Sequence, residues 1–375
     1  MRFAARIGLA LILLSCGDGQ VRRLSLSHSQ DLSLLLHQSE THCQIVNEDL
    51  DIGSFLSKDS EGQLISVVRD QNTSQTGLVQ IDPESLDLKV LDESASKAMD
   101  IKISEDSIAY RLEESVKFLA AGKPEELLSA GVSKLMAFEQ TSKSLLLQVQ
   151  NMNGGFDWVC FNQDHQISAG ASSEDRILSI AHDAQDRQWI ALESSDGIYL
   201  QKNSLCLDTD SAIYRPKLKY RTEHAKLMVI DKQAFLSFLN MENGNFELLI
   251  FNLDSEVWSH EIIDGAAYQN YLGMDIDAQV IPRFERPIYL YLDAWKLEPK
   301  LAIFYKGKWK TSHIGIGGSS GFYNQILSID ENKMKIAFRS FRNAMSTGRS
   351  SFENLVLCEI DFKPMVDTKN AQDKN

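Results

Sequence analysis

Two short serine motifs are the first candidates for chemistry in this sequence. Gly317-Gly-Ser-Ser-Gly321 has the spacing G-x-S-x-G, in which a sharp turn from a strand into a helix exposes a nucleophilic serine. Here an apolar strand pattern follows from Gln325, and no histidine has a context that would make it the base. Ser94-Ala-Ser-Lys97 has the spacing Ser-x-x-Lys but lies in a polar turn. The sequence therefore predicts loops at both places and no catalytic residue.

Residue types that bind metals are present but scattered. No histidine pair has an i, i+4 spacing with a glutamate between, and no cysteine pair has the short spacing of a zinc site. Three acidic pairs could supply calcium ligands from loops: Asp49 and Asp51, Asp183 and Asp186, and Asp275 and Asp277. The favoured interpretation is solvated turns, whose Asp side chains accept hydrogen bonds from nearby backbone. We expect no metal and no cofactor.

Two further clusters fall in the last third of the chain. Five arginines would suit an anionic ligand on one rim, or would simply balance nearby acids: Arg283, Arg286, Arg339, Arg342 and Arg349. Six aromatic residues could line a sugar or peptide site, or pack in a β-rich core: Tyr268, Tyr271, Tyr289, Tyr291, Trp295 and Tyr305. The second interpretation is favoured for both clusters.

The N-terminal residues form an export signal. A basic start precedes an apolar run over residues 7–14, and the small residue Ser15 lies directly before Cys16. The run is too short to span a bilayer, which takes about 20 residues. It resembles the lipobox of bacterial lipoproteins: Leu13, Ser15 and Cys16 match, and Leu14 is a tolerated departure.

The resemblance implies that the Cys16 thiol carries a diacylglycerol, that residues 1–15 are removed, and that the new amino group carries a further acyl chain such as palmitate. Two or more acyl chains anchor a protein stably in a membrane. In enteric-type bacteria an aspartate directly after this cysteine retains a lipoprotein in the inner membrane, and Gly17 stands there instead. We therefore expect a cell-envelope protein, periplasmic or surface-exposed, with the outer membrane favoured. The alternative is an ordinary secretory signal that contains a cysteine.

Composition limits the classes of partner. The 375 residues are 43% apolar and 24% charged, as in a globular chain with a sizeable core. The formal net charge is −14, and removal of residues 1–15 takes away two arginines, which gives −16. Because no long basic stretch interrupts this acidity, we expect no nucleic-acid partner. The acidity is compatible with cationic or neutral partners, but the favoured interpretation is that it maintains solubility alone.

An apolar strand recurs seven times, and in five of the seven copies its central residue is the small Ser or Ala. The copies begin 38 to 53 residues apart and are Ile65-Ser-Val67, Ile108-Ala-Tyr110, Leu146-Leu-Gln148, Ile190-Ala-Leu192, Leu236-Ser-Phe238, Tyr289-Leu-Tyr291 and Ile336-Ala-Phe338. Most copies have a strand before and after, and several have a fourth, more polar strand. Helix is scarce, with Pro124-Glu-Glu-Leu-Leu-Ser129 the one candidate for a helical turn.

Four strands in every 40 to 50 residues is the period of propeller blades, which stack in a ring to bury their faces. We therefore predict an all-β fold, a β-propeller of seven four-stranded blades, with six or eight blades as alternatives. The propeller is expected over residues 43–363. A signal peptide (1–15) and a tether (16–42) precede it, and a disordered tail (364–375) follows.

The ends of the propeller should meet in one blade. The last unit lacks a fourth strand, and the isolated strand Cys43-Gln-Ile-Val46 could supply it. Cys43 would then lie beside the strand that carries Cys358, within reach of a disulfide. Export permits disulfides, and with one cysteine acylated four remain, in three connectivities. Cys160 and Cys206 are a weaker pair, and free buried cysteines are an equal alternative.

One stretch of the repeat array resembles known propellers. The segment Ile177 to Leu200, with Asp183-Ala-Gln-Asp186 and Trp189-Ile-Ala-Leu192, is similar to blades of bacterial sensor-type and sialidase-like propellers. The Asp-box of sialidases and the Trp-Asp ending of WD repeats are absent. The topology is also similar to that of the outer-membrane assembly lipoprotein that is itself a propeller, but its Gly-x-x-x-Ala-Leu-Asp repeat is missing.

Two functions follow as expectations. Rim loops, a lipid anchor and the lack of a catalytic set favour a non-catalytic scaffold that binds another envelope protein or a surface ligand. The alternative is a hydrolase or lyase acting on glycans or peptidoglycan-like polymers. A funnel at the ring axis with convergent carboxylates of perturbed pKa would favour the enzyme. The fold alone decides neither.

Overall fold

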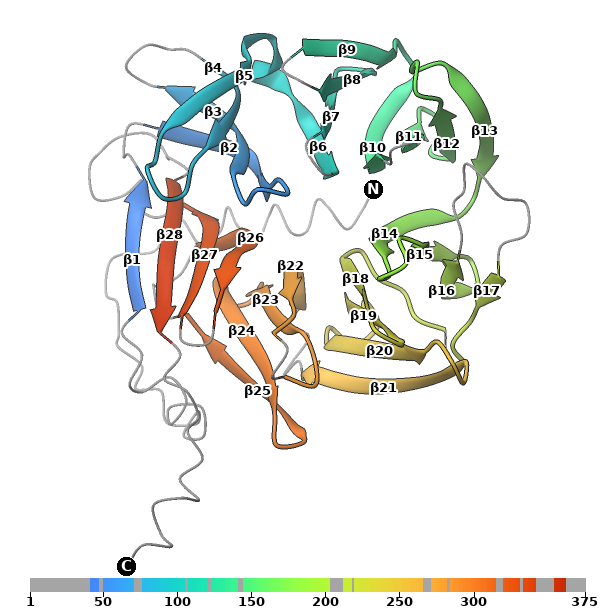
Figure 1. The fold of residues 1–375 in the computed structure, drawn as a ribbon, viewed down its shortest axis with the longest axis vertical. Coiled ribbons are helices and arrows are strands. Elements are labelled where there is room, and N and C mark those ends of the chain that lie inside the picture. Colours follow the sequence, from blue (N-terminus) through green and yellow to red (C-terminus); the bar gives the residue numbers. More distant parts are fainter. Residues whose placement is uncertain are drawn as a thin grey trace, which may run out of the picture.

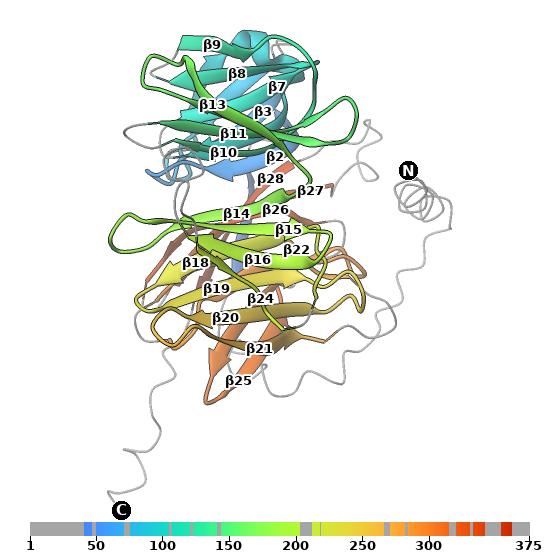
Figure 2. The same ribbon diagram turned by 90° about the vertical axis from the view of Figure 1, so that its right-hand side faces the viewer.

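The seven predicted blades form a closed ring. The computed structural model describes residues 41–46, 50–70, 76–104, 107–120, 123–140, 144–202, 212–217, 219–265, 271–281, 284–314, 320–330, 333–341 and 354–361. Within these residues the strands form seven four-stranded antiparallel sheets around one axis (Figure 1). The fold is therefore an all-β, seven-bladed propeller, and the alternatives of six and eight blades are wrong. Figure 2 shows the same ring from the side.

Each blade is a meander that runs outward from the ring axis. The innermost strands are β2 (Leu50–Lys58), β6 (Met99–Ser104), β10 (Val132–Gln140), β14 (Arg176–His182), β18 (Ala225–Ile230), β22 (Leu272–Gln279) and β26 (Ser320–Ile329). The second strands are β3 (Leu64–Asp70), β7 (Ser107–Leu112), β11 (Leu145–Asn151), β15 (Gln188–Ser194), β19 (Gln233–Leu239), β23 (Ile288–Asp293) and β27 (Lys333–Ser340). The third strands are β4 (Thr76–Ile81), β8 (Ser115–Ala120), β12 (Phe156–Phe161), β16 (Gly197–Lys202), β20 (Phe246–Asn252), β24 (Glu298–Tyr305) and β28 (Asn354–Asp361). The outermost strands are β5 (Leu88–Asp92), β9 (Lys123–Leu128), β13 (Ile167–Ser173), β17 (Ala212–Tyr214), β21 (Val257–Asp264), β25 (Lys308–His313) and β1 (Thr41–Val46).

All seven segments aligned from the sequence lie in the second strand of a blade. Their central residues are each 0% exposed: Ser66, Ala109, Leu147, Ala191, Ser237, Leu290 and Ala337. A second strand has neighbouring blades over both faces, and small side chains there let the sheets pack at interior density. The repeat is thus visible in the sequence because this strand is buried on both sides.

The apolar core is divided among the seven blade interfaces. Seven buried clusters each join side chains of two adjacent blades. Between blades six and seven, for example, Ile288 and Leu290 belong to one cluster with Ile336 and Phe338. Each fully buried Leu, Ile or Phe contributes about 1.5–3 kcal/mol. No blade can therefore bury its faces without its neighbours.

A polar contact also recurs between blades. Among the described residues, five backbone N–H groups of innermost strands donate to polar side chains of the preceding blade. The pairs are Leu135 to Asp100 (3.3 Å), Gln140 to Ser104 (2.9 Å), Ile177 to Gln148 (2.6 Å), Leu227 to Ser179 (3.0 Å) and Ile326 to Asp277 (2.8 Å). These bonds fix the register of one innermost strand against the next. Each one satisfies a backbone N–H that has no acceptor in a strand of its own blade.

The two ends of the propeller meet in blade seven, which confirms the predicted closure. β1 pairs antiparallel with β28 and places Cys43 opposite Cys358, with Cα atoms 4.1 Å apart. A disulfide joins these cysteines across a sequence separation of 315 residues. Cys160 is buried and is also disulfide-bonded, but Cys206 lies outside the described residues, so their pairing stays a prediction.

Two further features concern helices. The helical turn predicted at 124–129 is wrong, because β9 (Lys123–Leu128) pairs with β8 there. Pro124 is tolerated since β9 is an outermost strand, where a missing N–H breaks no second ladder. A 3-10 helix, η1 (Glu93–Lys97), links blades one and two. Among the described residues no helix is long and apolar enough to cross a membrane, and Cys16 lies outside them.

Candidate functional site

A cavity of about 370 Å³ lies on the axis of the ring, where all seven innermost strands contribute to its wall. Many of its lining residues are polar or charged: Ser57, Lys102, Glu139, Ser179, Lys226, Asp275, Tyr323, Asn324 and Gln325. Such side chains face one another here because the innermost strands of all the blades approach the same axis (Figure 1). We take this axial cavity as the candidate site.

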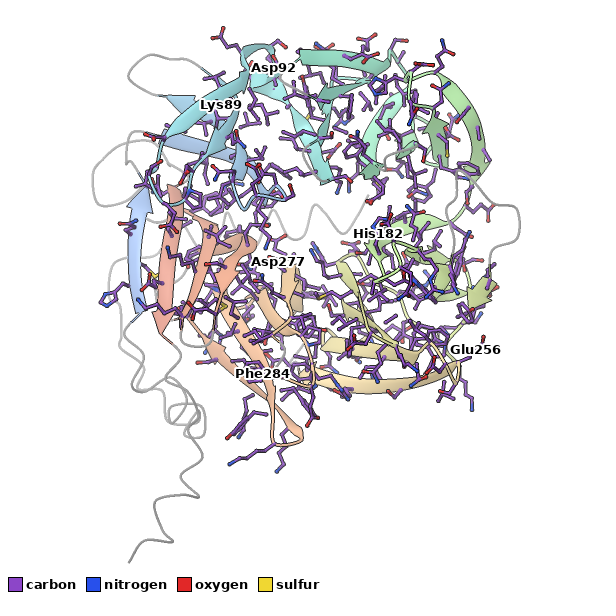
Figure 3. The ribbon with its side chains drawn as sticks, in the orientation of Figure 1. Lys89, Asp92, His182, Glu256, Asp277 and Phe284 are labelled. Carbon is purple, nitrogen blue, oxygen red and sulfur yellow. A yellow bond between two sulfur atoms is a disulfide. The ribbon has the colours of Figure 1, made fainter. Side chains whose placement is uncertain are left out.

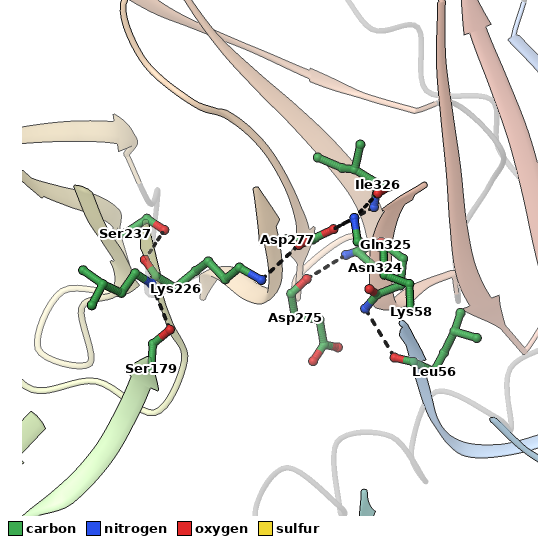
Figure 4. Close-up of polar contacts among 11 residues, drawn as sticks. Leu56, Lys58, Ser179, Lys226, Ser237, Asp275, Asp277, Asn324, Gln325 and Ile326 are labelled. Carbon is green, nitrogen blue, oxygen red and sulfur yellow. Dashed lines mark hydrogen bonds and ion pairs between the residues drawn. The ribbon is translucent and has the colours of Figure 1, made fainter. Parts of the chain in front are cut away.

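Asp277, from β22 of blade six, ties four innermost strands together (Figure 4). Its carboxylate accepts the backbone N–H of Ile326 at 2.8 Å and forms ion pairs with Lys226 at 3.2 Å and Lys58 at 3.3 Å. Lys58 also donates to the Ile326 carbonyl oxygen. These contacts join β18, β22, β26 and β2, which belong to blades five, six, seven and one. The network therefore bridges the point at which the ring closes.

The Asp277 side chain is committed to this network. Burial raises the pKa of its carboxyl, but the ammonium groups of Lys226 and Lys58 and two backbone N–H groups outweigh burial, and the pKa stays below its usual value. The carboxylate is thus ionised at neutral pH, with its oxygens occupied by protein donors. Asp277 acts as a structural tie and is not available as a base for a substrate.

The carboxyl group of Asp275, two residues earlier on β22, differs from that of Asp277 in both its pKa and its partners. Burial raises the pKa of its carboxyl, and no lysine or arginine of the described residues forms an ion pair with it. The Asp275 carboxylate accepts the backbone N–H of Tyr323. Both residues have a left-handed backbone, with φ of 46° and 54°, which costs energy in residues other than glycine. Such strain tends to occur at functional sites, because the surrounding structure must impose it.

His224, which precedes β18, is the ionisable neighbour of Asp275. Burial lowers the pKa of the His224 imidazole, while the negative charge of Asp275 acts in the opposite direction. The two groups therefore favour a protonated carboxyl beside a neutral imidazole. A proton-holding acid next to a neutral base is an arrangement used in acid–base chemistry.

Lys102, from β6 of blade two, is a second ionisable group of the cavity that has no ion-pair partner among the described residues. Burial lowers the pKa of its ammonium group; the charge of Asp100 acts against this shift, and that of Lys134 adds to it. In the part of the chain that the structure describes, the side chain of Lys102 makes no hydrogen bond and no ion pair. Blades two and six lie on opposite sides of the axis (Figure 1), and Lys102 and Asp275 line the same cavity from these two blades.

A third acidic group of the cavity has a histidine partner. Glu139 of β10 lies 3.5 Å from the Nδ1 atom of His182, at the end of β14. Figure 3 shows His182 and Asp277 toward the centre of the ring, whereas Lys89 lies on the outer strand β5. The axial cavity therefore holds charges of both signs from several blades.

The serine motifs are not part of this site. Ser319, the central serine of G-x-S-x-G, lies outside the described residues. Ser320 and Gly321 begin the strand β26, so the motif lacks the helix that a nucleophile elbow requires. Ser94 lies in η1, where its hydroxyl donates to the carboxylate of Asp92 at 2.7 Å. Neither motif has the geometry of a nucleophile.

Most described histidines pair singly with carboxylates far from one another. The pairs outside the cavity are His165 with Glu125 (2.7 Å), His260 with Glu247 (2.9 Å) and His313 with Asp293 (2.9 Å). No group of three residues that could hold a metal occurs among the described residues.

The three acidic pairs differ in role. Asp183 accepts two backbone N–H groups of its own turn at 3.0 Å, as predicted for a turn. The same interpretation is wrong for Asp275 and Asp277, because a strand carries them to the ring axis. Asp49 and the side chain of Asp51 lie outside what the structure describes.

The structure does not bring the described members of the arginine and aromatic clusters together into one site. Arg286 pairs with Glu261 at 3.0 Å, and buried Arg339 lies over the Tyr323 ring. Three other members of the arginine cluster lie outside the described residues: Arg283, Arg342 and Arg349. The aromatic side chains of Tyr289 and Tyr291 are core residues, at 1% and 0% exposure. Trp295 is 73% exposed on a turn, Tyr271 and Tyr305 are half-buried, and Tyr268 is outside the described residues.

Sequence reasoning missed Lys102, Lys226 and Glu139 as site residues. A signal for the lysines was present, because each interrupts or borders an apolar strand: Ile101-Lys-Ile103, and Lys226 before Leu-Met-Val-Ile230. A long cation inside a strand that is otherwise buried needs a partner or a cavity. Placement of these strands innermost was the missing step.

Comparison with known proteins supports the fold and no family. No protein-family model matches the sequence, and no curated protein matches it. A prolyl endopeptidase structure is similar with a TM-score of 0.51 and 15% identity, over 78% of this chain and 45% of that one. The AfRom2 CNH domain is similar with a TM-score of 0.51 and 8% identity, over 84% of this chain and 98% of that one. At these identities the likeness shows a shared propeller fold alone.

Proposed function

We propose that this protein is a lipid-anchored lipoprotein of the bacterial cell envelope whose propeller binds a ligand or an envelope protein without catalysing a reaction. The observation that carries the binding part is the axial cavity, where Lys102 and Asp275 have no ion-pair partner among the described residues. Burial shifts both groups toward their neutral forms, and a ligand of opposite charge would stabilise the charged form of each by pairing with it. The carboxylate of Asp277 is already occupied by structural contacts.

The anchoring part rests on the N-terminal sequence, with its apolar run over residues 7–14 and Ser15 before Cys16. Expression of the full chain in a Gram-negative host with labelled palmitate tests it. The wild-type protein should take up the label and sediment with outer-membrane vesicles, and Cys16→Ser should do neither. A wild-type chain that stays soluble and unlabelled would overturn the anchor.

The binding part is tested by two measurements on the same protein. Cross-linking of the tagged, lipidated chain in its native membrane reports a protein partner. Equilibrium dialysis of the purified propeller reports retained small molecules. Stoichiometric capture in either measurement supports the proposal, and an empty result in both contradicts it.

A second function is favoured by one observation, the neighbouring Asp275 and His224 with pKa values shifted toward their neutral forms. Such a pair could serve as acid and base in a hydrolase or lyase acting on glycans or peptidoglycan-like polymers. Release of soluble fragments from isolated cell wall by the wild type, lost in Asp275→Asn and His224→Gln, would support this function. If no fragment is released, the enzymatic function is contradicted and only the binding function remains.

A further inference from the structure

Lys102 and Asp275 bring an amine and a carboxyl group, which can form opposite charges, to the axial cavity from opposite sides of the ring. Figure 1 shows β6 of blade two and β22 of blade six facing each other across the ring. Both residues line the same cavity of about 370 Å³, within the range of about 300–1,000 Å³ typical of small-molecule sites. We propose that this cavity binds a small zwitterion with separated ends, such as a short peptide or an ω-amino acid, its carboxylate on Lys102 and its ammonium on Asp275. This inference rests on the proposed ligand-binding function and specifies its ligand.

The carboxylate end is assigned by comparing the lysines that reach the axis. Lys58 and Lys226 both pair with Asp277, at 3.3 Å and 3.2 Å. The side chain of Lys102 has neither a hydrogen bond nor an ion pair within the described residues, and isoleucines flank it in the strand. A carboxylate forms its strongest hydrogen bonds with such a charged donor. Lys102 is therefore the group that a ligand carboxylate would meet.

The ammonium end is assigned by the same comparison among the acids. Asp277 has two lysine partners, and Glu139 has a histidine 3.5 Å away. The Asp275 carboxylate accepts the Tyr323 N–H, and His224 and Arg339 act on it electrostatically, but it forms no ion pair in the described structure. The left-handed backbone of Asp275 and Tyr323 holds this part of the wall in place. A ligand ammonium would supply the missing cation.

The separation of the two walls sets the shape of the ligand. In a seven-bladed ring no two blades are farther apart than three positions, and blades two and six have this maximal separation. An α-amino acid has both charges on one carbon and cannot reach both walls at once. A ligand with its charges at opposite ends can, and the hydrocarbon between them would lie against cavity residues such as Met136 and Ile276. Chain length therefore becomes a measurable specificity.

The test is isothermal titration of the purified propeller with glycine, 4-aminobutanoate, 6-aminohexanoate and triglycine. This series changes the distance between the two charges and leaves their chemistry unchanged. Hexanoate and hexylamine are matched controls, because each keeps the six-carbon chain and removes one charge. We expect a longer zwitterion to bind best and each single-charge control to bind about 10-fold more weakly or worse, since it loses one charge-assisted hydrogen bond.

Three variants locate the binding. Lys102→Met keeps the apolar stem, and Asp275→Asn tolerates a left-handed backbone, so both are expected to fold. Each should weaken the best zwitterion about 10-fold or more. Lys89→Met, on exposed β5, should bind like the wild type (Figure 3). Thermal melts of all three variants identify any loss caused by misfolding.

The outcomes separate this inference from the proposed function. If hexanoate binds as tightly as 6-aminohexanoate and keeps that affinity in Asp275→Asn, the zwitterion proposal is overturned. This result would indicate that the ligand is a simple anion. If no zwitterion binds but another small molecule is retained and lost in Lys102→Met, the inference fails while ligand binding stands. If nothing is retained and no protein is cross-linked, both fail.

Discussion

Replacement of Asp277 by asparagine tests whether the axial network holds the ring closed. The variant keeps the shape of the side chain and removes the negative charge between Lys58 and Lys226. Breaking a fully buried ion pair by removing one partner costs about 3–5 kcal/mol, whereas an exposed pair contributes about 0–1 kcal/mol. Asp277 is 5% exposed, but the two lysine side chains are 25% and 39% exposed and can turn toward solvent. We therefore expect a loss of about 2–3 kcal/mol, between these limits.

Urea unfolding followed by tryptophan fluorescence measures this loss, because urea does not screen charges. Asp186→Asn is the control: Asp186 is exposed in a turn with φ of 59°, a backbone that asparagine accepts, and the change should stay within about 0.5 kcal/mol. A loss in Asp277→Asn no larger than in the control would refute the structural role of the network.

The pH dependence of the same difference checks the cause. The folded-state pKa of Asp277 lies below its unfolded value, so its stabilisation is complete above the unfolded pKa of about 3.9 and is lost as the pH falls through the folded pKa. The gap between wild type and Asp277→Asn should stay constant from pH 7 to about 5 and close below about pH 4. A gap that closed between pH 7 and 5 would show that another group is responsible.

Three further predictions concern closure, packing and buried charge. The C43S/C358S variant should lose up to about 5–6 kcal/mol, since the disulfide closes a separation of 315 residues; urea midpoints measured with and without a reductant check this. Gly273→Ala should destabilise the fold by about 2 kcal/mol or more, because the added Cβ would lie 2.4 Å from a phenylalanine ring. Gly62→Ala has open space around the added Cβ and should cost about 1 kcal/mol. Thermal melts of the two variants, measured side by side, test this difference. Asp275→Asn should raise the urea midpoint at pH 8. The pKa of Asp275 is higher in the folded state than in the unfolded state, so the ionised carboxylate destabilises the fold above the folded-state pKa, and asparagine removes this charge. An unchanged midpoint would contradict this prediction.

The sequence predicted the second strand of every blade and a strand before most of them, but it did not indicate that these preceding strands lie innermost and form the site. Second strands such as 288–293 are buried on both faces, so they are continuously apolar and align with one another. Innermost strands also contribute to the wall of the axial cavity, and there Lys102 and Asp275 replace apolar residues, which weakens the pattern. The contact between Lys58 and Asp277 spans 219 residues, and no local pattern in the sequence indicates it. The Cys43–Cys358 contact could be predicted from the sequence, because the last repeat unit lacked a fourth strand and the isolated strand at Cys43 belonged to no unit.

The covalent closure of blade seven also determines how the domain would respond to force. A pull on the chain before β1 would peel that strand from β28 one residue pair at a time, beginning at Thr41 and Ile360. The third pair is Cys43 with Cys358, where the disulfide stops the peeling and passes the load into β28. That strand is held on its other side by β27, so further extension would have to disrupt the blade itself. A protein tethered at its N-terminus would thus carry tension through one clamped edge while the axial cavity keeps its shape.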